Sequence, residues 1–362
     1  MHKVLIIGGY GKVGTEAAAL LSSVPNIQLS IGGRNIEKAK AAASKFNAEA
    51  VYIDTDNILS IEEAVKNTDI VINCFIDIDK VNTDVAKTVI KFGKIYIDPA
   101  GVPNDHLHAI IALHHEAVAG NALVITGLGV NPGIIGILLQ NHASRFEEVT
   151  ESEVYFTLGS NFEDISVLSL RGVGKMTSIP PKIFTDGNWI KPVQSSKKLF
   201  IDSPFNKKIF FGASAFTPDI EFMPDLKTFK KISIWSGIER FLQSMVFLFG
   251  IKLGYTKSDK KAERFLKFLN YLGRNKKYHP ELNLTILTMG KANGKSYLRK
   301  TTFCCTEVKA TAIAPVLLCR QLIESEINQK GAYYPVQITD TEDFIKRLAD
   351  SGIGFTDETF EF

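Results

Sequence analysis

The first fourteen residues, MHKVLIIGGYGKVG, constrain the fold of this chain more than any other stretch. An apolar run from Val4 to Ile7 leads directly into Gly9-x-Gly11-x-x-Gly14 and then into an alanine-rich segment. This order predicts a buried strand, a glycine turn and a helix, the first βα junction of a dinucleotide-binding fold. There Gly9 permits the tight turn, Gly11 lets N–H groups approach a pyrophosphate, and Gly14 lets the helix pack on the strand. The alternative is a glycine-rich βα turn that binds nothing. The expected cofactor contacts in this turn are Gly9, Tyr10, Gly11, Lys12, Val13 and Gly14.

The first 145 residues alternate short apolar runs with helical patterns. Apolar runs without polar alternation are typical of strands that are covered on both faces. The alternation therefore predicts an α/β fold, with a Rossmann-type parallel sheet over residues 1–145 and helices on both of its sides. The expected strands are Val4–Ile7, Leu29–Ile31, Val51–Ile53, Ile70–Cys74, Ile95–Ile97 and Leu123–Thr126.

After residue 146 the apolar segments become aromatic and β-branched. Asn293-Gly294 lies between two such segments, 283–291 and 296–306, and predicts a β-hairpin. We therefore expect a second α+β domain with a mostly antiparallel sheet over residues 146–315, for substrate binding or dimerisation. Residues 316–362 are expected to form a C-terminal segment that returns to pack on the Rossmann domain. A helix is expected at 105–119 and others at 238–250, 258–274 and 308–328.

Composition excludes several classes of protein. A length of 362 residues fits two domains, and a net charge of +3 gives no sign of nucleic-acid binding. The four cysteines lack a CxxC spacing and no secretory signal precedes the first strand, so we expect a cytoplasmic protein. A homodimer through the sheet of the second domain is expected on general grounds.

The most hydrophobic long stretch is residues 241–253, FLQSMVFLFGIKL. It is too short to span a bilayer as a helix, so no transmembrane segment is expected. We interpret it as a buried helix or a dimer contact, with a membrane-surface or lipid-facing segment as the alternative.

The second strand ends as Ile31-Gly32-Gly33-Arg34-Asn35, without the Asp or Glu that would accept hydrogen bonds from an NAD ribose. An arginine can instead form paired hydrogen bonds with a 2′-phosphate, which a carboxylate would repel. We therefore expect NADP(H) to be preferred over NAD(H), with Arg34 and Asn35 on the phosphate. The alternative for Arg34 is stacking on adenine without setting a preference.

Ligands of open α/β sheets bind beyond the carboxyl ends of the strands. Asp54, after the third strand, is expected at the adenine edge, with a helix cap or a turn as the alternative. Asp98, after the fifth strand, is a catalytic candidate that could hold a substrate ammonium or relay a proton, and its alternative is an Asx turn before Pro99. The remaining expected cofactor contacts follow the fourth and sixth strands: Asn73, Cys74, Phe75, Asn131, Pro132 and Gly133. We expect Pro132 in the first turn of a helix and Gly133 at a close approach.

Two residues of the second domain are further catalytic candidates. Arg171, which we place in a glycine-rich loop, could bind a substrate carboxylate, and Lys175 could act as a general acid. Both could also be ordinary loop charges. The histidines at 106, 108, 114 and 115 share one expected helix but lack an HExxH spacing, so no metal site is expected.

These features together resemble the saccharopine dehydrogenase NADP-binding family. The resemblance is carried by GGYGKVG, GGRN, INCF, YIDPAG, GLGVNPGIIGILL and the C-terminal KGAYYPVQITDTEDFIKRLADSGI. It covers residues 1–145 and 330–355 and is weak between them. It implies a Rossmann domain with an inserted α+β domain, and NAD(P)-linked oxidoreduction that makes or breaks a secondary amine, without a metal. Gln337 stands where many relatives have Glu, so the substrate does not carry over.

The sequence thus predicts an NADP(H)-dependent oxidoreductase that reduces a C=N, C=O or C=C bond of a small metabolite. In this interpretation the nicotinamide supplies the hydride and the protein supplies orientation and electrostatics. A non-enzymatic NADP(H)-binding regulator and a trans-acting enoyl reductase on a lipid-like substrate are the alternatives.

Overall fold

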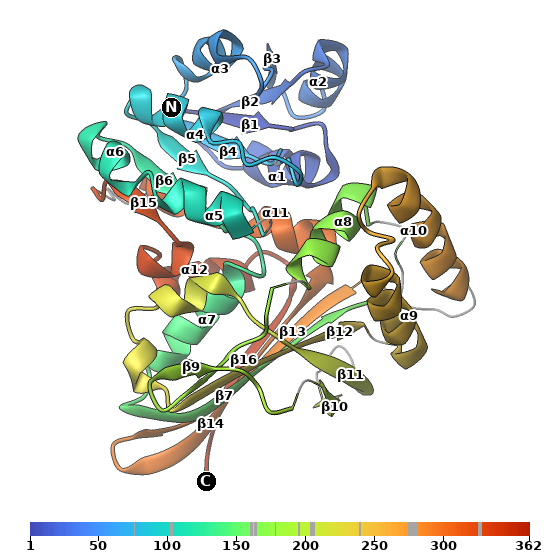
Figure 1. Cartoon of the computed structure of the whole chain (residues 1–362). Helices are drawn as coiled ribbons and strands as arrows, with labels where there is room; N and C mark the ends of the chain where they lie inside the picture. Colours follow the sequence, from blue (N-terminus) through green and yellow to red (C-terminus); the bar gives the residue numbers. More distant parts are fainter. Residues whose placement is uncertain are drawn as a thin grey trace. The chain divides into compact units, whose positions relative to one another are not determined.

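The computed structural model describes residues 1–75, 77–101, 104–159, 162, 165–177, 179–194, 196–202, 207–238, 240–273, 281–324 and 328–362 (Figure 1). The chain divides into two compact units, each made of two segments. Unit 1 contains Met1–Ile134 and Val308–Phe344, and unit 2 contains Ile135–Glu307 and Ile345–Phe362. The first boundary thus lies at Ile134 rather than at residue 145, and the C-terminal segment is shared between the units.

Unit 1 is built on a parallel sheet, which confirms the Rossmann-type prediction. All of its strand pairs are parallel. The direction of strand order reverses between β4 and β1, and ligands of open α/β sheets bind at such a reversal. The strands in spatial order are β15 (Gly331–Tyr333), β6 (Leu123–Ile125), β5 (Ile95–Ile97), β4 (Ile70–Asn73), β1 (His2–Ile7), β2 (Ile27–Gly33) and β3 (Glu49–Tyr52).

Helices cover both faces of this sheet because its strands are apolar on both sides. Leu5 and Ile7 pack with the core that α3 and α4 contribute, and Val4 and Ile6, on the opposite face, are equally buried. The single helix expected at 105–119 is two helices. The helices are α1 (Lys12–Ser22), α2 (Ile36–Ala43), α3 (Ile58–Val65), α4 (Asp84–Lys91), α5 (Asn104–Ile111), α6 (His114–Ala119) and α11 (Glu307–Glu324), with the 3₁₀ turn Pro335–Gln337. Helix α12 (Thr341–Ala349) crosses the boundary between the units.

Unit 2 is built on a mostly antiparallel sheet, as predicted. Asn293 and Gly294 both have positive φ and form the expected hairpin turn between β13 and β14. The exception to the antiparallel pattern is the parallel pair of β7 and β12. In spatial order the strands are β10 (Ser196–Asp202), β11 (Lys207–Ala215), β12 (Lys231–Ile238), β7 (Glu148–Leu158), β13 (Glu281–Ala292), β14 (Lys295–Thr306) and β16 (Gly354–Glu361). Strands β8 (Ile183–Thr185) and β9 (Asn188–Ile190) extend beside β12.

The helices of unit 2 are α7 (Ile134–Ala143, whose first residue belongs to unit 1), α8 (Val167–Met176), α9 (Phe241–Lys252) and α10 (Asp259–Gly273). Short 3₁₀ turns lie at Pro218–Phe222 and Leu226–Thr228. Part of the expected helices 258–274 and 308–328 lies outside the described residues.

A buried polar network joins α7 to the sheet of unit 2. His142 Nδ1 lies 2.7 Å from the Thr288 hydroxyl, and His142 Nε2 lies 2.8 Å from the Thr301 hydroxyl. Thr301 donates its own hydrogen to Asp357, so Nε2 must be the protonated nitrogen and Nδ1 the acceptor. Thr288 in turn bonds Ser152. The network thus fixes a neutral imidazole in one tautomer.

Burial and the charge of Arg299 oppose the protonation of His142, while the charge of Asp357 favours it. Burial, and then the positive charge of Arg299, lower the pKa of His142 to about 3. Burial opposes the charge of Asp357, but hydrogen bonds from Arg299 and Thr301 outweigh it and leave its pKa lowered. Arg299 also donates to the side chain and the carbonyl of Asn141, at 2.7 and 3.1 Å.

Candidate functional site: the strand ends of unit 1

The turn after β1 is closed by glycines. Gly8 has a left-handed φ of +72°, so it is Gly8, the residue before the predicted motif, that makes the tight turn. Gly11 donates from its N–H to the Gly8 carbonyl at 2.9 Å. A Cβ on Gly14 would lie 2.4 Å from that carbonyl oxygen, and a Cβ on Gly9 would lie 2.9 Å from Ile31 Cγ2. Gly9 and Gly14 therefore serve close packing.

The turn delivers the N-terminus of α1 to the strand ends. Gly11 is the N-cap and offers no side chain to the N–H groups of the first turn. The residues of that turn, Lys12 to Thr15, include no carboxylate that would compete for these groups. An uncapped helix N-terminus behind a glycine turn is suited to an anion such as a pyrophosphate.

The end of β2 carries Arg34 on the surface. The ring of Tyr10 lies against Gly33, where a Cβ would come within 2.3 Å of the ring. Asn35 is the N-cap of α2, because its side-chain oxygen accepts from the Lys38 N–H at 2.9 Å. Arg34 is exposed and places its positive charge in solvent at this strand end.

Arg34 reaches across the glycine turn to the end of β4. Its guanidinium carbon lies 5.9 Å from the centroid of the Phe75 ring, a cation–π arrangement. Phe75 packs on the turn itself, since a Cβ on Gly8 would lie 3.1 Å from Phe75 Cβ. Because β1 lies between β2 and β4, Arg34 and Phe75 flank the reversal point of the sheet.

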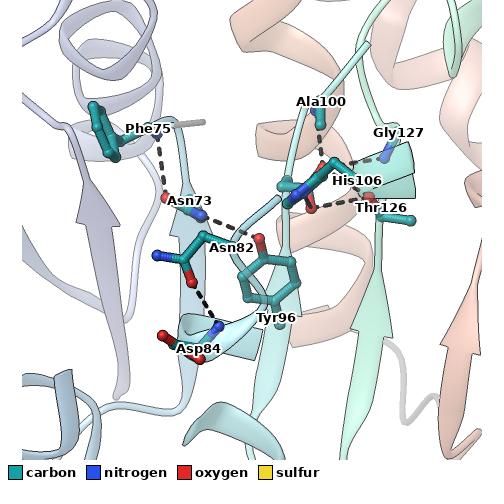
Figure 2. Close-up of polar contacts among 10 residues, drawn as sticks. Asn73, Phe75, Asn82, Asp84, Tyr96, Ala100, His106, Thr126 and Gly127 are labelled. Carbon is teal, nitrogen blue, oxygen red and sulfur yellow. Dashed lines mark hydrogen bonds and ion pairs between the residues drawn. The ribbon is translucent and has the colours of Figure 1, made fainter. Parts of the chain in front are cut away.

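The end of β4 is held by a buried amide. Asn73 donates from Nδ2 to the Tyr96 hydroxyl at 3.1 Å and accepts from the Phe75 N–H at 3.2 Å (Figure 2). Burial raises the pKa of Tyr96 well above its ordinary value, and the nearby Asp98 carboxylate adds to this effect. Burial, and then Asp98, also raise the pKa of Cys74 to about 12. Cys74 is therefore a neutral thiol at physiological pH rather than a nucleophile.

Asp98 is fully buried after β5 and organises the neighbouring loops. Its carboxylate accepts from the Ala100 N–H at 2.9 Å, from the Thr126 hydroxyl at 3.0 Å and from the Gly127 N–H at 3.2 Å. Figure 2 shows these groups and His106 gathered at one point; His106 Nε2 lies 3.4 Å from Asp98 Oδ2. Both carboxylate oxygens already accept hydrogen bonds from the protein. Asp98 would therefore act by positioning the loops that contain these donors, rather than by direct contact with a ligand.

The loop after β6 folds back on itself. Gly133 has a φ of +115°, and a Cβ there would lie 2.4 Å from the Gly129 carbonyl oxygen, so a glycine is needed for the packing of the loop itself. Helix α7 begins at Ile134, so Pro132 precedes the helix and the expectation that it lies in the first turn is wrong. Asn131 Oδ1 is buried and has no hydrogen-bond partner among the described residues. This oxygen is available to accept a hydrogen bond from a bound group.

The N-terminal part of the chain matches a known family. The model described as "Saccharopine dehydrogenase NADP binding domain" matches residues 4–125. Residues 4–125 are thus similar to the NADP-binding domain of saccharopine dehydrogenases. The match confirms the resemblance expected from the sequence and contains the glycine turn, Arg34, Asn73 and Asp98.

The whole chain shares its fold with solved dehydrogenases. It is similar to apo saccharopine dehydrogenase (L-Glu forming) from Saccharomyces cerevisiae, with a TM-score of 0.74 and 14% identity over 99% of this chain and 100% of that one. It is also similar to DAP dehydrogenase of C. glutamicum in complex with DAP, with a TM-score of 0.52 and 13% identity over 96% and 98% of the two chains. At such identities the likeness shows the fold.

Other predicted site residues lie outside the glycine turn or already bond other protein groups. Asp54 forms an Asx turn, accepting from the Asp56 N–H at 3.2 Å, which is the alternative that the sequence left open. Arg171 lies inside α8, so its expected place in a loop is wrong, and it donates to Asp259 at 2.5 Å. Lys175 lies in the last turn of the same helix. Both belong to unit 2.

Sequence reasoning missed the role of His106. It expected no metal site at the four histidines of 106–115 but gave His106 no partner, whereas the structure places His106 against Asp98 and places His114 on the Ala332 backbone. Among the residues that the structure describes, no cluster of three or more His, Cys, Asp or Glu could hold a metal ion. In the same described part of the chain, no helix combines the length and apolarity needed to cross a membrane.

Proposed function

We propose that the chain is an NADP(H)-dependent oxidoreductase that reduces a C=N or C=O bond of a small metabolite. The observation that carries the cofactor preference is Arg34, exposed at the end of β2 with its guanidinium over Phe75. The match to an NADP-binding domain and the fold shared with two proteins named as dehydrogenases support a redox role.

The residues at the strand ends fit this cofactor. The glycine turn leaves no Cβ between the N-terminus of α1 and a pyrophosphate, and Arg34 supplies a cation for a 2′-phosphate. Asn73 and Phe75 would hold the part of the cofactor that follows the pyrophosphate, and Asn131 Oδ1 offers an unused acceptor. When bound, NADP(H) supplies or accepts the hydride.

The chain's own residues would position the reaction. Asp98 fixes the loops that begin at Ala100 and Gly127, so we assign it a positioning role. Cys74 stays protonated and contributes no nucleophile. In unit 2, Lys175 is kept as a candidate proton donor, and Arg171 as a carboxylate ligand that would first have to release Asp259.

A second function is favoured by the outward side of α9, where large apolar side chains are exposed. Such a surface would suit a lipid-like substrate, and the reduced bond would then be C=C.

The homodimer and the cytoplasmic location expected from the sequence stay predictions.

The proposal is tested by mixing the protein with NADPH and a panel of imines, keto acids and enoyl compounds. We expect NADPH oxidation with at least one C=N or C=O compound, and much slower oxidation at the same low NADPH concentration by the cofactor-binding variant Gly11→Ala. Oxidation with enoyl compounds alone would favour the second function. Tight NADPH binding without oxidation across the panel would contradict both and support a regulator.

A further inference from the structure

Helix α9 turns its apolar side to solvent. Six large apolar residues of α9 and its C-cap are each at least 42% exposed, and Leu242 and Phe249 reach 64% and 62%. At 100° per residue they occupy one continuous arc of the helix. These residues, which we call the α9 face, are Phe241, Leu242, Met245, Leu248, Phe249 and Leu253.

The inward side of α9 carries Gln243, Ser244, Phe247 and Gly250, and these hold the helix in its orientation. Ser244 donates to the Ile238 carbonyl at 2.8 Å, and Gln243 donates to the Leu269 carbonyl at 3.2 Å. Phe247 stacks on Phe265 of α10 with the ring centroids 6.3 Å apart. Gly250 also packs on Phe265, where a Cβ would lie 2.2 Å from the ring. Rotating α9 to hide the α9 face would break all of these contacts.

The neighbouring helix α10 adds cations and aromatic rings. Its exposed side carries Phe268 and Tyr271, which are 49% and 69% exposed. The same side carries the exposed cations Lys260, Lys261, Arg264 and Lys267. Residues 240–273 contain seven Lys or Arg and two Asp or Glu. Both acids are paired, Asp259 with Arg171 and Glu263 with Lys267.

We propose that the hairpin of α9 and α10 docks the protein on the surface of an anionic lipid membrane. Large exposed apolar patches mark interaction sites, and an apolar helix face beside Lys, Arg, Phe and Tyr is the pattern of helices that lie in a membrane interface. Helix α9 has 12 residues, too few to cross a bilayer but enough to lie in its plane. The basic residues match anionic headgroups.

The charge of the hairpin argues against a second copy as the occupant. Two copies that met through the α9 face would bring two basic hairpins together, and like charges at an interface oppose association. An anionic membrane covers the apolar face and neutralises the cations at the same time.

The test is co-sedimentation of the full chain with vesicles of phosphatidylcholine, with or without phosphatidylserine. We expect binding to the serine-containing vesicles that weakens with added salt, and little binding to phosphatidylcholine alone. The double variant Leu242→Ser/Phe249→Ser should bind at least tenfold more weakly, and Lys260→Glu/Lys261→Glu should lose the preference for phosphatidylserine. Leu59→Ser, at a 75% exposed residue of α3, is the matched control and should bind as the wild type does. Circular dichroism checks that each variant is folded.

Two results would overturn the proposal. One is equal vesicle binding by the wild type and both hairpin variants. The other is a wild-type dimer, seen by analytical ultracentrifugation, that Leu242→Ser/Phe249→Ser dissociates while no form binds vesicles; the α9 face would then be covered by a second copy. Neither result depends on NADPH turnover, so the docking surface and the proposed function are tested separately.

Discussion

At the scale of single residues, the proposed preference for NADP(H) depends on the charge of the side chain at the end of β2. An acidic side chain there accepts hydrogen bonds from the ribose of NAD, whereas a cation attracts the 2′-phosphate of NADP. Arg34 is exposed and already lies over Phe75, so little reorganisation separates it from a phosphate beside the glycine turn.

Replacing Arg34 by Asp should reverse the cofactor preference. We expect NADPH affinity to fall roughly 10- to 100-fold, about 1.4–2.8 kcal/mol, because a carboxylate repels the 2′-phosphate. NADH affinity should hold or rise. Isothermal titration with both cofactors measures the change. Lys45→Ala, which removes an exposed cation beyond the far end of α2, is the control, and an unchanged NADPH affinity in Arg34→Asp would refute the assignment.

The sequence was sufficient to place the residues that lie close to an apolar run, while their contacts with a cofactor stay predictions. Gly11, Gly14 and Arg34 are recognisable because their spacing from an apolar run fixes their place in a βα unit. The Asx turn in which Asp98 accepts from the Ala100 N–H is the alternative that the sequence left open, whereas its contacts with His106 and Thr126 could not be read in this way, since these residues lie farther along the chain. Asn35 shows a further limit, because one amide side chain suits a helix cap and a phosphate equally, and here it is the cap.

At the scale of elements, two glycines of the junction between β1 and α1 allow cofactor binding to be tested separately from folding. Gly11 and Gly14 stand three residues apart in one turn, but a Cβ has different consequences at each. At Gly11 it would lie 3.1 Å from one carbonyl oxygen, whereas at Gly14 it would lie 2.4 and 2.7 Å from two backbone atoms.

Gly11→Ala should therefore remove cofactor binding and leave the fold intact. We expect at least a tenfold loss of NADPH affinity, because the methyl group occupies the approach of the pyrophosphate, and a change in unfolding free energy within about 1 kcal/mol. Gly14→Ala should lower both. Titration together with urea unfolding distinguishes the two variants, and normal NADPH binding by Gly11→Ala would argue against the turn as the phosphate site.

The network between α7 and the sheet of unit 2 predicts a dependence of stability on pH. The pKa of His142 is lowered from 6.5 to about 3, so between these values the unfolded chain binds a proton that the folded chain does not. Stability should therefore be lost as pH falls from 6.5 toward 3, with His142 contributing up to about 1.4 kcal/mol per pH unit.

Replacing His142 by Gln should remove the contribution of His142 to the change of unfolding free energy with pH. This expectation is independent of the effect of the substitution on stability at neutral pH. Urea unfolding at a series of pH values measures the slope. His115→Gln, at an exposed histidine, should leave it unchanged. Equal slopes in the wild type and His142→Gln would show that His142 does not carry the dependence.

At the scale of the whole molecule, the order of elements along the chain indicated the two sheets. It did not indicate that the C-terminal segment contributes a strand to each of them. The alternation of strands and helices and the Asn293-Gly294 turn were enough for a parallel and an antiparallel sheet. A return of residues 316–362 to the Rossmann domain was expected, and β15 pairs with β6 there, but the pairing of β16 with β14 joins distant segments in a way that no local pattern encodes.

Helix α9 also shows a limit of prediction from the sequence, because the pattern did not indicate which of its sides is buried. Its sequence is apolar almost all round, which is typical of a buried helix, and only packing could show which side is covered. The structure buries Gln243, Ser244 and Phe247 and exposes the six residues of the α9 face, because hydrogen bonds and the Phe247–Phe265 stack fix the orientation of the helix.

The most direct test of the central claim is a crystal structure of the chain with NADPH bound. We predict that the pyrophosphate lies at the N-terminus of α1, against Gly11, and that the guanidinium of Arg34 lies within hydrogen-bond distance of the 2′-phosphate. A pyrophosphate bound elsewhere, or a 2′-phosphate that Arg34 does not contact, would contradict the account.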